Sequence, residues 1–159
     1  MEYLGHIISS EGVATDPQKT TAIFHWPTPT NVTEVRAFLG LTGYYRKFVK
    51  RYGIIAKPLT NLLRHKNFQW TEQAQEAFDA LKVAMTSTPV LTLPNFNTPF
   101  IVETDARGEG IGAVLMQEGK PVAFLSKALG DKHRNLSIYE KEFRALIMSV
   151  EKWKHYLQR

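Results

Sequence analysis

The spacing of hydrophobic residues changes at residues 87–99, and this change limits the folds that the chain can adopt. Before this segment, apolar residues recur mostly three or four positions apart, which is the period of amphipathic helices. After it, they fall in short runs that are typical of strands. The segment itself, STPVLTLPNFNTP, holds three prolines and two asparagines and is typical of a linker. The sequence therefore predicts a mainly helical half followed by a half that contains a sheet.

Local signals divide the first half of the chain into a short hairpin and a series of helices. Turn-forming residues from Ser9 to Gly12 predict the hairpin. Asp16 followed by Pro17 is typical of a helix start, because the carboxylate can cap the helix and proline is tolerated at its first position. This helix is expected to end near Trp26. Further helices are predicted over residues 31–52, 54–63 and 71–86.

The second half is predicted to hold three strands, at residues 100–105, 111–116 and 121–126. QEGK at residues 117–120 is a plausible hairpin turn. Ser137 and Glu140 form a capping box that opens a helix reaching about Leu157. We expect the large apolar side chains of this helix to face the sheet: Tyr139, Phe143, Leu146, Ile147, Val150 and Leu157. Helices followed by an antiparallel sheet and one covering helix make an α+β fold.

Composition excludes several classes of protein. Hydrophobic residues make up 43% of the 159 residues, enough for a packed core and unlike a disordered chain. Without cysteine, the chain has neither disulfides nor a thiolate metal site. No apolar run approaches the roughly 20 residues of a membrane helix, and the N-terminus lacks the features of a signal peptide. A soluble intracellular protein without membrane association is expected.

Positive charge is concentrated in the first half. Residues 1–70 hold nine Lys and Arg against four Asp and Glu, whereas residues 71–159 hold eleven of each. No acidic residue lies between Glu34 and Glu72. Such a stretch is typical either of a solvated basic face or of a surface that binds a polyanion. Its basic side chains include Arg46, Lys47, Lys50, Arg51, Lys57, Arg64 and Lys66.

Asp105 is the residue whose partner matters most. It ends the apolar run PFIVETD, and strand alternation puts Ile101, Glu103 and Asp105 on one face. Three glycines follow closely and let backbone or a ligand approach the strand end. A carboxylate at the end of a buried strand is costly unless something pairs with it. The sequence leaves three kinds of partner for the Asp105 carboxylate open: a backbone turn, a basic side chain or a metal ion.

Glu142 offers a second carboxylate on the predicted last helix. It precedes Phe143 by one residue and Leu146 by four, so it lies at the border of the predicted apolar face and can point at the end of the first strand. Two carboxylates repel unless one is protonated or a cation lies between them. Oxygen ligands without Cys or a nearby His favour Mg²⁺ over zinc. Carboxylates that hold two Mg²⁺ ions ~4 Å apart can hydrolyse phosphodiesters.

Several long segments of the sequence carry a family resemblance. VETDARGEGIGAVLMQEGKPVAFLSKAL and LSIYEKEFRALIMSVEKWKHYL resemble the start of the RNase H domain in gypsy-type LTR retrotransposon polyproteins. YLGHIISSEGVATDPQK, WPTPTNVTEVRAFLGLTGYYRKFVKRYG and FQWTEQAQEAFDALK resemble the end of the reverse transcriptase that precedes it. The resemblance covers essentially the whole chain in the same order. It implies a parent enzyme that hydrolyses RNA in RNA–DNA hybrids and performs RNA-directed DNA synthesis.

The resemblance also implies domains and site residues. The implied divisions are a primer-grip-like hairpin at the end of the palm (1–13), a thumb-like helical region (14–86), a linker (87–99) and the β-β-β-α first half of an RNase H-like domain (100–159). Asp105 and Glu142 correspond to the first two catalytic, metal-binding carboxylates. Together with the basic stretch, the resemblance predicts nucleic-acid contacts at Tyr3, Gly5, His6, Tyr44, Arg46, Lys47, Lys50 and Arg51. Of the tyrosine pair, Tyr44 is expected to be more exposed than Tyr45.

A cofactor and partners follow from the same resemblance. It implies a two-ion site for Mg²⁺ or Mn²⁺ that residues beyond Arg159 complete, since family members carry the third catalytic Asp on the next strand. The implied partners are RNA–DNA hybrid, primer-template duplex, and the polymerase palm and fingers, remaining RNase H and integrase of the polyprotein, in a cytoplasmic particle and in the nucleus. Arg107 is a departure, because the family usually has Ser there. Its guanidinium can contact a phosphate or compete with the cation.

Two other interpretations stay open. The second half can be a non-catalytic, connection-like module that binds nucleic acid, which Arg107 and the missing third Asp favour and the retention of Asp105 and Glu142 opposes. The chain can also be an inactive genomic relic. The 159-residue chain by itself is expected to be inactive, because it holds only part of each active site. It is also expected to be marginally stable or to aggregate, because no later strands cover its sheet edge and apolar surface.

Overall fold

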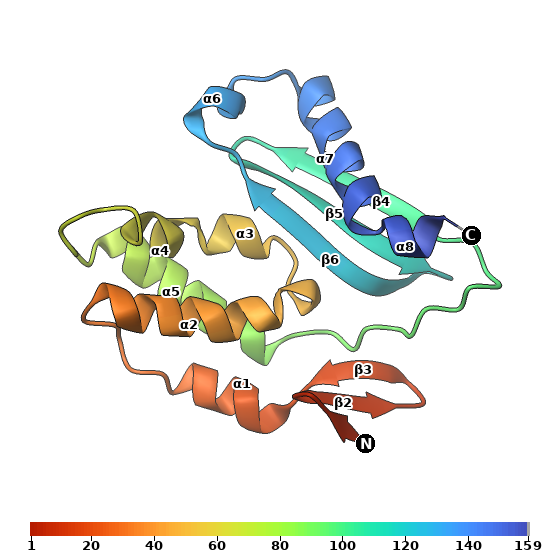
Figure 1. The fold of residues 1–159 in the computed structure, drawn as a ribbon, viewed down its shortest axis with the longest axis horizontal. Coiled ribbons are helices and arrows are strands. Elements are labelled where there is room, and N and C mark those ends of the chain that lie inside the picture. Colours follow the sequence, from red (N-terminus) through yellow and green to blue (C-terminus); the bar gives the residue numbers. More distant parts are fainter. Residues whose placement is uncertain (159) are drawn as a thin grey trace.

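The computed structural model describes residues 1–158 and contains two larger parts joined by an extended segment (Figure 1). We call residues 16–86 the helical half and residues 100–158 the sheet half. The predicted α+β fold class is confirmed. Within residues 1–158, none of the helices has the length and apolar character needed to span a membrane.

The N-terminal residues form a small antiparallel sheet in the order β1-β2-β3. Its strands are β1 (Glu2–Tyr3), β2 (His6–Ser9) and β3 (Gly12–Thr15). Pairing of Ser9 with Gly12 confirms the predicted hairpin turn. Val13 and Leu91 exchange two backbone hydrogen bonds of 2.7 and 2.8 Å, so the segment between the halves is tied to this sheet.

Five helices form the helical half: α1 (Pro17–Phe24), α2 (Val32–Tyr44), α3 (Tyr52–Ile55), α4 (Lys57–Leu62) and α5 (Glu72–Thr86). The predicted caps hold, because Asp16 accepts from the Gln18 amide and Asn31 from the Glu34 amide, both at 2.9 Å. The single helix predicted over residues 31–52 is wrong. It breaks after Tyr44 into a 3-10 turn, Arg46–Phe48, which returns the chain toward α2.

The break after α2 has a polar cause inside the core. Thr42 is fully buried, and its hydroxyl lies 2.9 Å from the Tyr52 hydroxyl. Tyr52 reaches this position because Arg51, with φ 64°, takes a left-handed conformation and turns the chain. A continuous helix would place Tyr52 almost three turns away from Thr42. The tertiary hydrogen bond therefore overrides the local helical pattern.

The sheet half contains β4 (Ile101–Arg107), β5 (Gly110–Gln117) and β6 (Lys120–Ala128) in antiparallel order β4-β5-β6. The β5–β6 turn is the predicted hairpin, with positive φ angles of 51° at Glu118 and 76° at Gly119. The helices α6 (Asp131–Arg134), α7 (Ile138–Lys152) and α8 (Lys154–Leu157) follow. Figure 1 shows α7 and α8 lying together on one face of this sheet.

The predicted inward face of α7 is wrong for its large side chains. Tyr139 is 79% exposed and Phe143 is 64% exposed, and Leu146, Ile147 and Val150 are exposed as well. The buried positions of α7 are Lys141, Ala145 and Ser149. Ala145 and Ser149 are small and let α7 lie close to the sheet, and Lys141 is the long side chain on this face. Of the predicted set, Leu157 does pack against the sheet half's core.

The opposite face of the sheet packs against the helical half. Phe124 of β6 contacts the helical core. The Gly53 amide donates a 2.7 Å hydrogen bond to the Ser126 hydroxyl. Gly110 of β5 has no side chain at the point where Ile54 packs, and an added Cβ would collide with Ile54. The sheet therefore lies between two layers, with α7 and α8 on one face and the helical half on the other.

Candidate functional site

Asp105 lies on the face of the sheet that meets the helical half. Residues paired across an antiparallel sheet point to the same side. Asp105 pairs with Gly112, and Gly112 pairs with Ser126, whose hydroxyl accepts the hydrogen bond from the helical half. The next residue, Ala106, points the other way and packs with side chains of α7. The sheet thus separates the Asp105 side chain from α7.

Two guanidinium groups occupy the two oxygens of the Asp105 carboxylate. Arg51 donates from Nη1 to Oδ2 at 2.9 Å. Arg107 Nε lies 3.4 Å from Oδ1. The Arg107 side chain is largely in solvent, whereas those of Arg51 and Asp105 are only 26% and 35% exposed. Of the three partners that the sequence leaves open, this structure gives Asp105 a basic side chain, and that side chain comes from the other half of the molecule.

The last long helix turns Lys141, not Glu142, toward the sheet. Lys141 is buried, and its Nζ donates to the Gly108 carbonyl at 2.9 Å, in the turn after β4. Glu142 is exposed. Within residues 1–158, neither a hydrogen bond nor an ion pair joins Glu142 to Asp105. The sequence pattern does not single out Lys141, because lysine is rarely buried.

The observed arrangement does not fit a divalent cation at Asp105. Carboxylate oxygens are suitable ligands for Mg²⁺. However, both Asp105 oxygens meet guanidinium groups, and a cation placed beside them would be repelled. In the described part of the chain, no three His, Asp or Glu side chains are grouped so that they could hold a metal ion. The structure joins Asp105 to Arg51 and does not bring it together with Glu142.

The hairpin that is expected to contact nucleic acid is held against the end of α2. Tyr45 donates from its hydroxyl to the Gly5 carbonyl at 2.9 Å, and Tyr44 donates to the Leu4 carbonyl. Gly5 has φ 80°, and a Cβ there would lie 2.8 Å from the Tyr45 hydroxyl, so glycine suits this position. Tyr44 is 51% exposed and Tyr45 is 1% exposed, as predicted. Tyr3 is also exposed and leaves an aromatic surface at the hairpin.

His6 lies inside this contact between the hairpin and α2. Its ring stacks on Phe48 with centroids 5.5 Å apart and lies 5.3 Å from Tyr44 and 5.6 Å from Tyr45. The His6 Nε2 atom is buried without a hydrogen-bond partner among the described residues. Burial, and then the charge of Lys47, lower the pKa of His6 from 6.5. These surroundings favour a neutral imidazole that packs as an aromatic ring.

The basic residues directly after α2 are partly engaged with aromatic rings. The Arg46 guanidinium lies 5.3 Å from the centre of the Tyr52 ring. The Lys47 ammonium lies 5.4 Å from the centre of the Phe48 ring, and burial lowers the pKa of Lys47. Cation–π contacts leave the charge in place but fix the direction of the side chain.

Among the basic residues that are predicted to contact nucleic acid, Lys50 has the fewest interactions with other side chains. It is exposed and forms no ion pair within residues 1–158. Together with Arg51, Arg107 and Glu103, it lines a cavity of about 140 Å³ beside Asp105. This cavity lies where the two halves meet and carries more positive than negative side chains.

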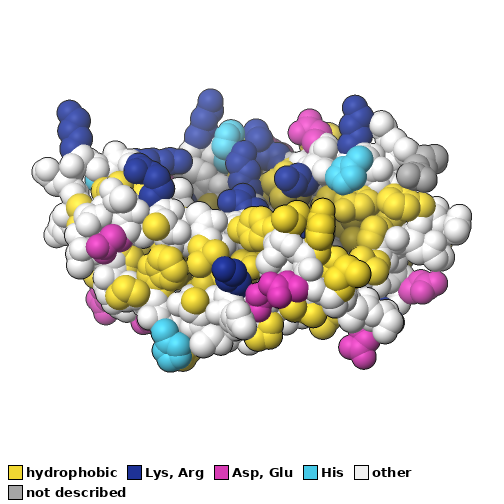
Figure 2. Space-filling model, turned by 60° about the horizontal axis from the view of Figure 1, so that its bottom comes forward, with side chains coloured by type: hydrophobic (Ala, Val, Ile, Leu, Met, Phe, Trp, Pro, Cys, Tyr) yellow, Lys and Arg dark blue, Asp and Glu magenta, His cyan; other side chains and the backbone are white. Residues whose placement is uncertain are grey.

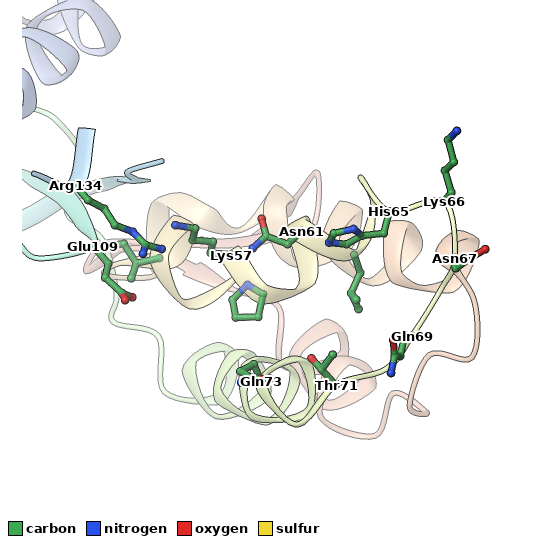
Figure 3. A pocket seen from close by; sticks show the side chains of 13 residues that line it. Lys57, Asn61, His65, Lys66, Asn67, Gln69, Thr71, Gln73, Glu109 and Arg134 are labelled. Carbon is green, nitrogen blue, oxygen red and sulfur yellow. The ribbon is translucent and has the colours of Figure 1, made fainter. Parts of the chain in front are cut away.

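A groove of about 640 Å³ runs from the helical half to the sheet half (Figure 3). Its lining includes Lys57, Asn61 and His65 on one side, Gln73 on the other, and Glu109 and Arg134 at one end. The sequence shows that Lys57 and Arg134 are basic, but it does not show that they lie close together. Only the tertiary fold brings both residues to this groove.

Charge is unevenly distributed over the face of the molecule drawn in Figure 2. Most visible Lys and Arg side chains lie along the upper rim of this view, and hydrophobic side chains form a broad area below them. Acidic side chains are scattered between and below.

The sequence matches a known family and known polyproteins. Residues 70–159 match the family described as "RNase H-like domain found in reverse transcriptase". The chain is 43% identical over 157 residues to the retrovirus-related Pol polyprotein from transposon 297 of Drosophila melanogaster, a match that covers 98% of this chain and 15% of the relative. It is 38% identical over 170 residues to the Pol polyprotein from transposon gypsy of the same organism, covering 99% of this chain and 16% of the relative. The predicted resemblance is confirmed, and the chain spans only a small part of these relatives.

Solved structures of the foamy viral protease-reverse transcriptase share the fold. The dRH form in complex with double-stranded DNA has a TM-score of 0.91 and covers 98% of this chain and 28% of that chain. The complex with RNA/DNA hybrid has a TM-score of 0.89 and covers 97% of this chain and 22% of that chain. Both are 21% identical to this chain, so the likeness concerns the fold.

Proposed function

The chain belongs to the family of RNase H-like domains found in reverse transcriptases, and from that membership we propose that its parent is a retrotransposon Pol polyprotein. The parent would hydrolyse RNA in RNA–DNA hybrids and perform RNA-directed DNA synthesis. In this proposal, residues 1–13 are the primer-grip-like hairpin, 14–86 the thumb-like region, 87–99 the linker and 100–159 the start of the RNase H-like domain. The 159-residue chain itself contributes nucleic-acid binding.

The observation that carries the proposal is a positive surface with contributions from both halves. Lys50 is exposed beside the junction, and Lys57 and Arg134 line the groove. Lys and Arg bind the phosphates of a duplex without regard to its sequence. The foamy viral proteins that share the fold were solved with double-stranded DNA and with RNA/DNA hybrid, which supports the same class of partner. We propose that exposed Tyr3 and Tyr44 add contacts to sugars or bases.

Fluorescence anisotropy with a labelled RNA–DNA hybrid tests this proposal. The affinity of the chain is expected to fall with salt, because binding releases counterions from the phosphates. Lys50→Gln should weaken binding for all sequences and reduce the salt slope by about one. Lys120→Gln, which removes an equal charge at the β5–β6 turn, serves as the control and should leave the slope unchanged. An affinity that is independent of salt and of Lys50 would overturn the proposal.

For the parent enzyme, we propose that Asp105 and Glu142 are two carboxylates of its Mg²⁺ or Mn²⁺ site. Residues beyond Arg159 would complete this site. Carboxylate oxygens are ligands that Mg²⁺ prefers, and this supports the assignment. The assignment also requires that, in the parent, Asp105 leaves its guanidinium partners and comes together with Glu142. In the parent polyprotein, Asp105→Asn keeps the size of the side chain and removes its charge, so hybrid cleavage should be lost while hybrid binding persists. Unchanged cleavage by this variant would show the assignment to be wrong.

The ion pairs of Asp105 favour a second candidate function, a non-catalytic module that binds nucleic acid and tethers the neighbouring domains. In that case the carboxylate serves structure alone. Calorimetric titration of the parent with Mn²⁺ separates the two candidates. A catalytic site should bind Mn²⁺ in a way that requires Asp105 and Glu142, and a tether should not.

A further inference from the structure

We propose that two recesses beside α4 form a binding track for an unpaired strand of nucleic acid, with a phosphate on one side of this helix and a nucleoside on the other. One recess is the groove of about 640 Å³ described above. The other, which we call the junction cavity, has a volume of about 300 Å³ and is lined by Arg46, Lys57 and Arg64. This inference rests on the proposed nucleic-acid binding of the chain and adds a separate place for a single strand.

The junction cavity has positive side chains and no negative ones. Its three cations come from the helical half, and β6 of the sheet half closes its other side. In the described part of the chain, no Asp or Glu belongs to the lining. Lys127 of β6 also lines the cavity, but it follows Ser126, which faces the helical half, so strand alternation turns the Lys127 side chain toward α7. A recess lined by charges of one sign attracts the opposite charge, here a phosphate.

Two of the three cations are held in place and still keep N–H groups for a ligand. The Arg46 Nε donates to the Gly43 carbonyl at 3.2 Å, and the guanidinium lies 5.3 Å from the centre of the Tyr52 ring. The Lys57 Nζ donates to the Leu129 carbonyl at 2.9 Å. A guanidinium has five N–H donors and an ammonium has three, and each of these hydrogen bonds uses one. Because these side chains are already positioned, binding a phosphate costs less side-chain entropy.

The groove on the other side of α4 has the mixed polarity that suits a nucleoside. Figure 3 shows Asn61 and His65 on one side of it and Gln73 on the other. Side-chain amides both donate and accept hydrogen bonds, as the edges of bases do. Glu109 at one end can only accept while it is ionised, so it suits a ribose hydroxyl or a base amino group and disfavours a phosphate there. An unpaired strand presents the pairing edges of its bases, whereas a duplex does not.

Helix α4 makes the two recesses continuous. Lys57 and Asn61 line both of them and lie four residues apart on α4, so they share one face of the helix. Both volumes fall within the range of about 300–1,000 Å³ that is typical of sites enclosing a small molecule. A single nucleotide can enter such a recess. A duplex is too stiff to bend into it and can only meet the rim.

Fluorescence anisotropy tests the track by comparing a labelled RNA without internal pairing with the labelled RNA–DNA hybrid. Arg64→Gln removes a cation of the junction cavity that is not among the residues proposed to contact the hybrid. Affinity for the single strand should fall about tenfold, as expected for loss of a hydrogen bond to a charged group. Affinity for the hybrid should change by less than about threefold, because an exposed charge away from the contact is screened by salt.

Matched variants separate the track from a general effect of charge. Arg36→Gln makes the same change at an exposed position of α2 outside both linings, and it should alter either affinity by less than about threefold. Asn61→Leu removes the amide between the recesses without removing charge, so it should weaken the single strand and leave the salt dependence unchanged. Arg64→Gln should instead reduce the salt slope for the single strand by about 0.7. Circular dichroism verifies that each variant folds before it is compared.

The outcomes distinguish the track from the proposed binding of the hybrid. A loss in Arg64→Gln that is much larger for the single strand than for the hybrid, and absent in Arg36→Gln, supports the track. If Arg64→Gln weakens both ligands equally or neither, while hybrid binding depends on Lys50, the track is overturned and the proposed function stands. Binding of the single strand alone, dependent on Arg64, supports the track and contradicts the proposed hybrid binding. If the unmodified chain binds neither ligand, both proposals fail together.

Discussion

The helical half closes its own core, whereas the sheet half leaves a large apolar surface on one helix. One continuous cluster of buried side chains extends from Ile23 to Leu91, and Phe38 at its centre is fully buried. The buried side chains of the sheet half fall into two small clusters. On α7 of that half, Phe143 remains 64% exposed.

The difference between the halves comes from the size of the residues at each packing face. Helix α5 directs Phe78, Leu81 and Met85 into the helical core. There the Phe78 ring meets aromatic rings from α2 and from the loop before α5. Helix α7 presents Ala145 and Ser149 to its sheet and turns its large side chains outward. An amphipathic pattern thus shows that a helix has an apolar face, but it does not show whether that face meets the nearest sheet.

The largest effect that tests this comparison is expected at Phe38. The Phe38 ring is fully buried, and its centroid lies 4.7 Å from that of Phe78. Phe38→Ala should lower the free energy of unfolding by about 3–5 kcal/mol, because it removes a large apolar side chain and leaves a cavity. Urea denaturation followed by circular dichroism measures this loss.

Phe143→Ala is the matched change in the sheet half. Because most of the Phe143 ring is already in water, its removal should cost less than about 0.5 kcal/mol in this chain. A loss at Phe143 as large as that at Phe38 would mean that α7 is covered in solution and that the two halves do not differ as described.

The next effect is expected where the halves meet. Gly110→Ala places a methyl group against Ile54 and 3.1 Å from the Lys127 carbonyl oxygen. Overpacking at this point should destabilise the chain by about 1–3 kcal/mol. Gly108→Ala, two residues earlier, has nothing within 4 Å of the added group and should change stability much less. Thermal unfolding of the two variants makes the comparison, and equal melting temperatures would argue against close packing of the halves.

Local chemistry made most of the elements predictable. Asp16, Asn31 and Ser137 each cap a helix through a side-chain oxygen that accepts a backbone N–H, and a short polar side chain before an apolar period signals this. The turn at residues 117–120 was predictable because Gly119 accepts a positive φ. The end of α2 was not predictable, because the Thr42–Tyr52 hydrogen bond depends on how the chain returns after Arg51.

The candidate site was predictable as residues but not as contacts. A carboxylate that ends an apolar run and precedes closely spaced glycines marks Asp105 from the sequence alone. Its partner Arg51 lies 54 positions away, and a sequence pattern carries no information about which basic side chain will cross that distance. Lys141 shows the same limit, because only the packed structure brings its ammonium group to the Gly108 carbonyl. The assignments of Asp105 and Glu142 as metal ligands remain predictions.

The smallest effect is a pH dependence expected at the hairpin. The pKa of His6 is lowered from 6.5 by burial and then by Lys47. As pH falls through 6.5, the unfolded chain therefore binds a proton more readily than the folded chain, and stability decreases. His6→Phe keeps the stacking on Phe48 and removes the titrating group, so the loss of stability between pH 7.5 and 5.5 should become smaller than in the unmodified chain. His155→Gln, at an exposed position of α8, is the control and should retain the original dependence. Urea denaturation at the two pH values decides the matter, and an unchanged dependence in His6→Phe would mean that His6 is not the buried group that resists protonation.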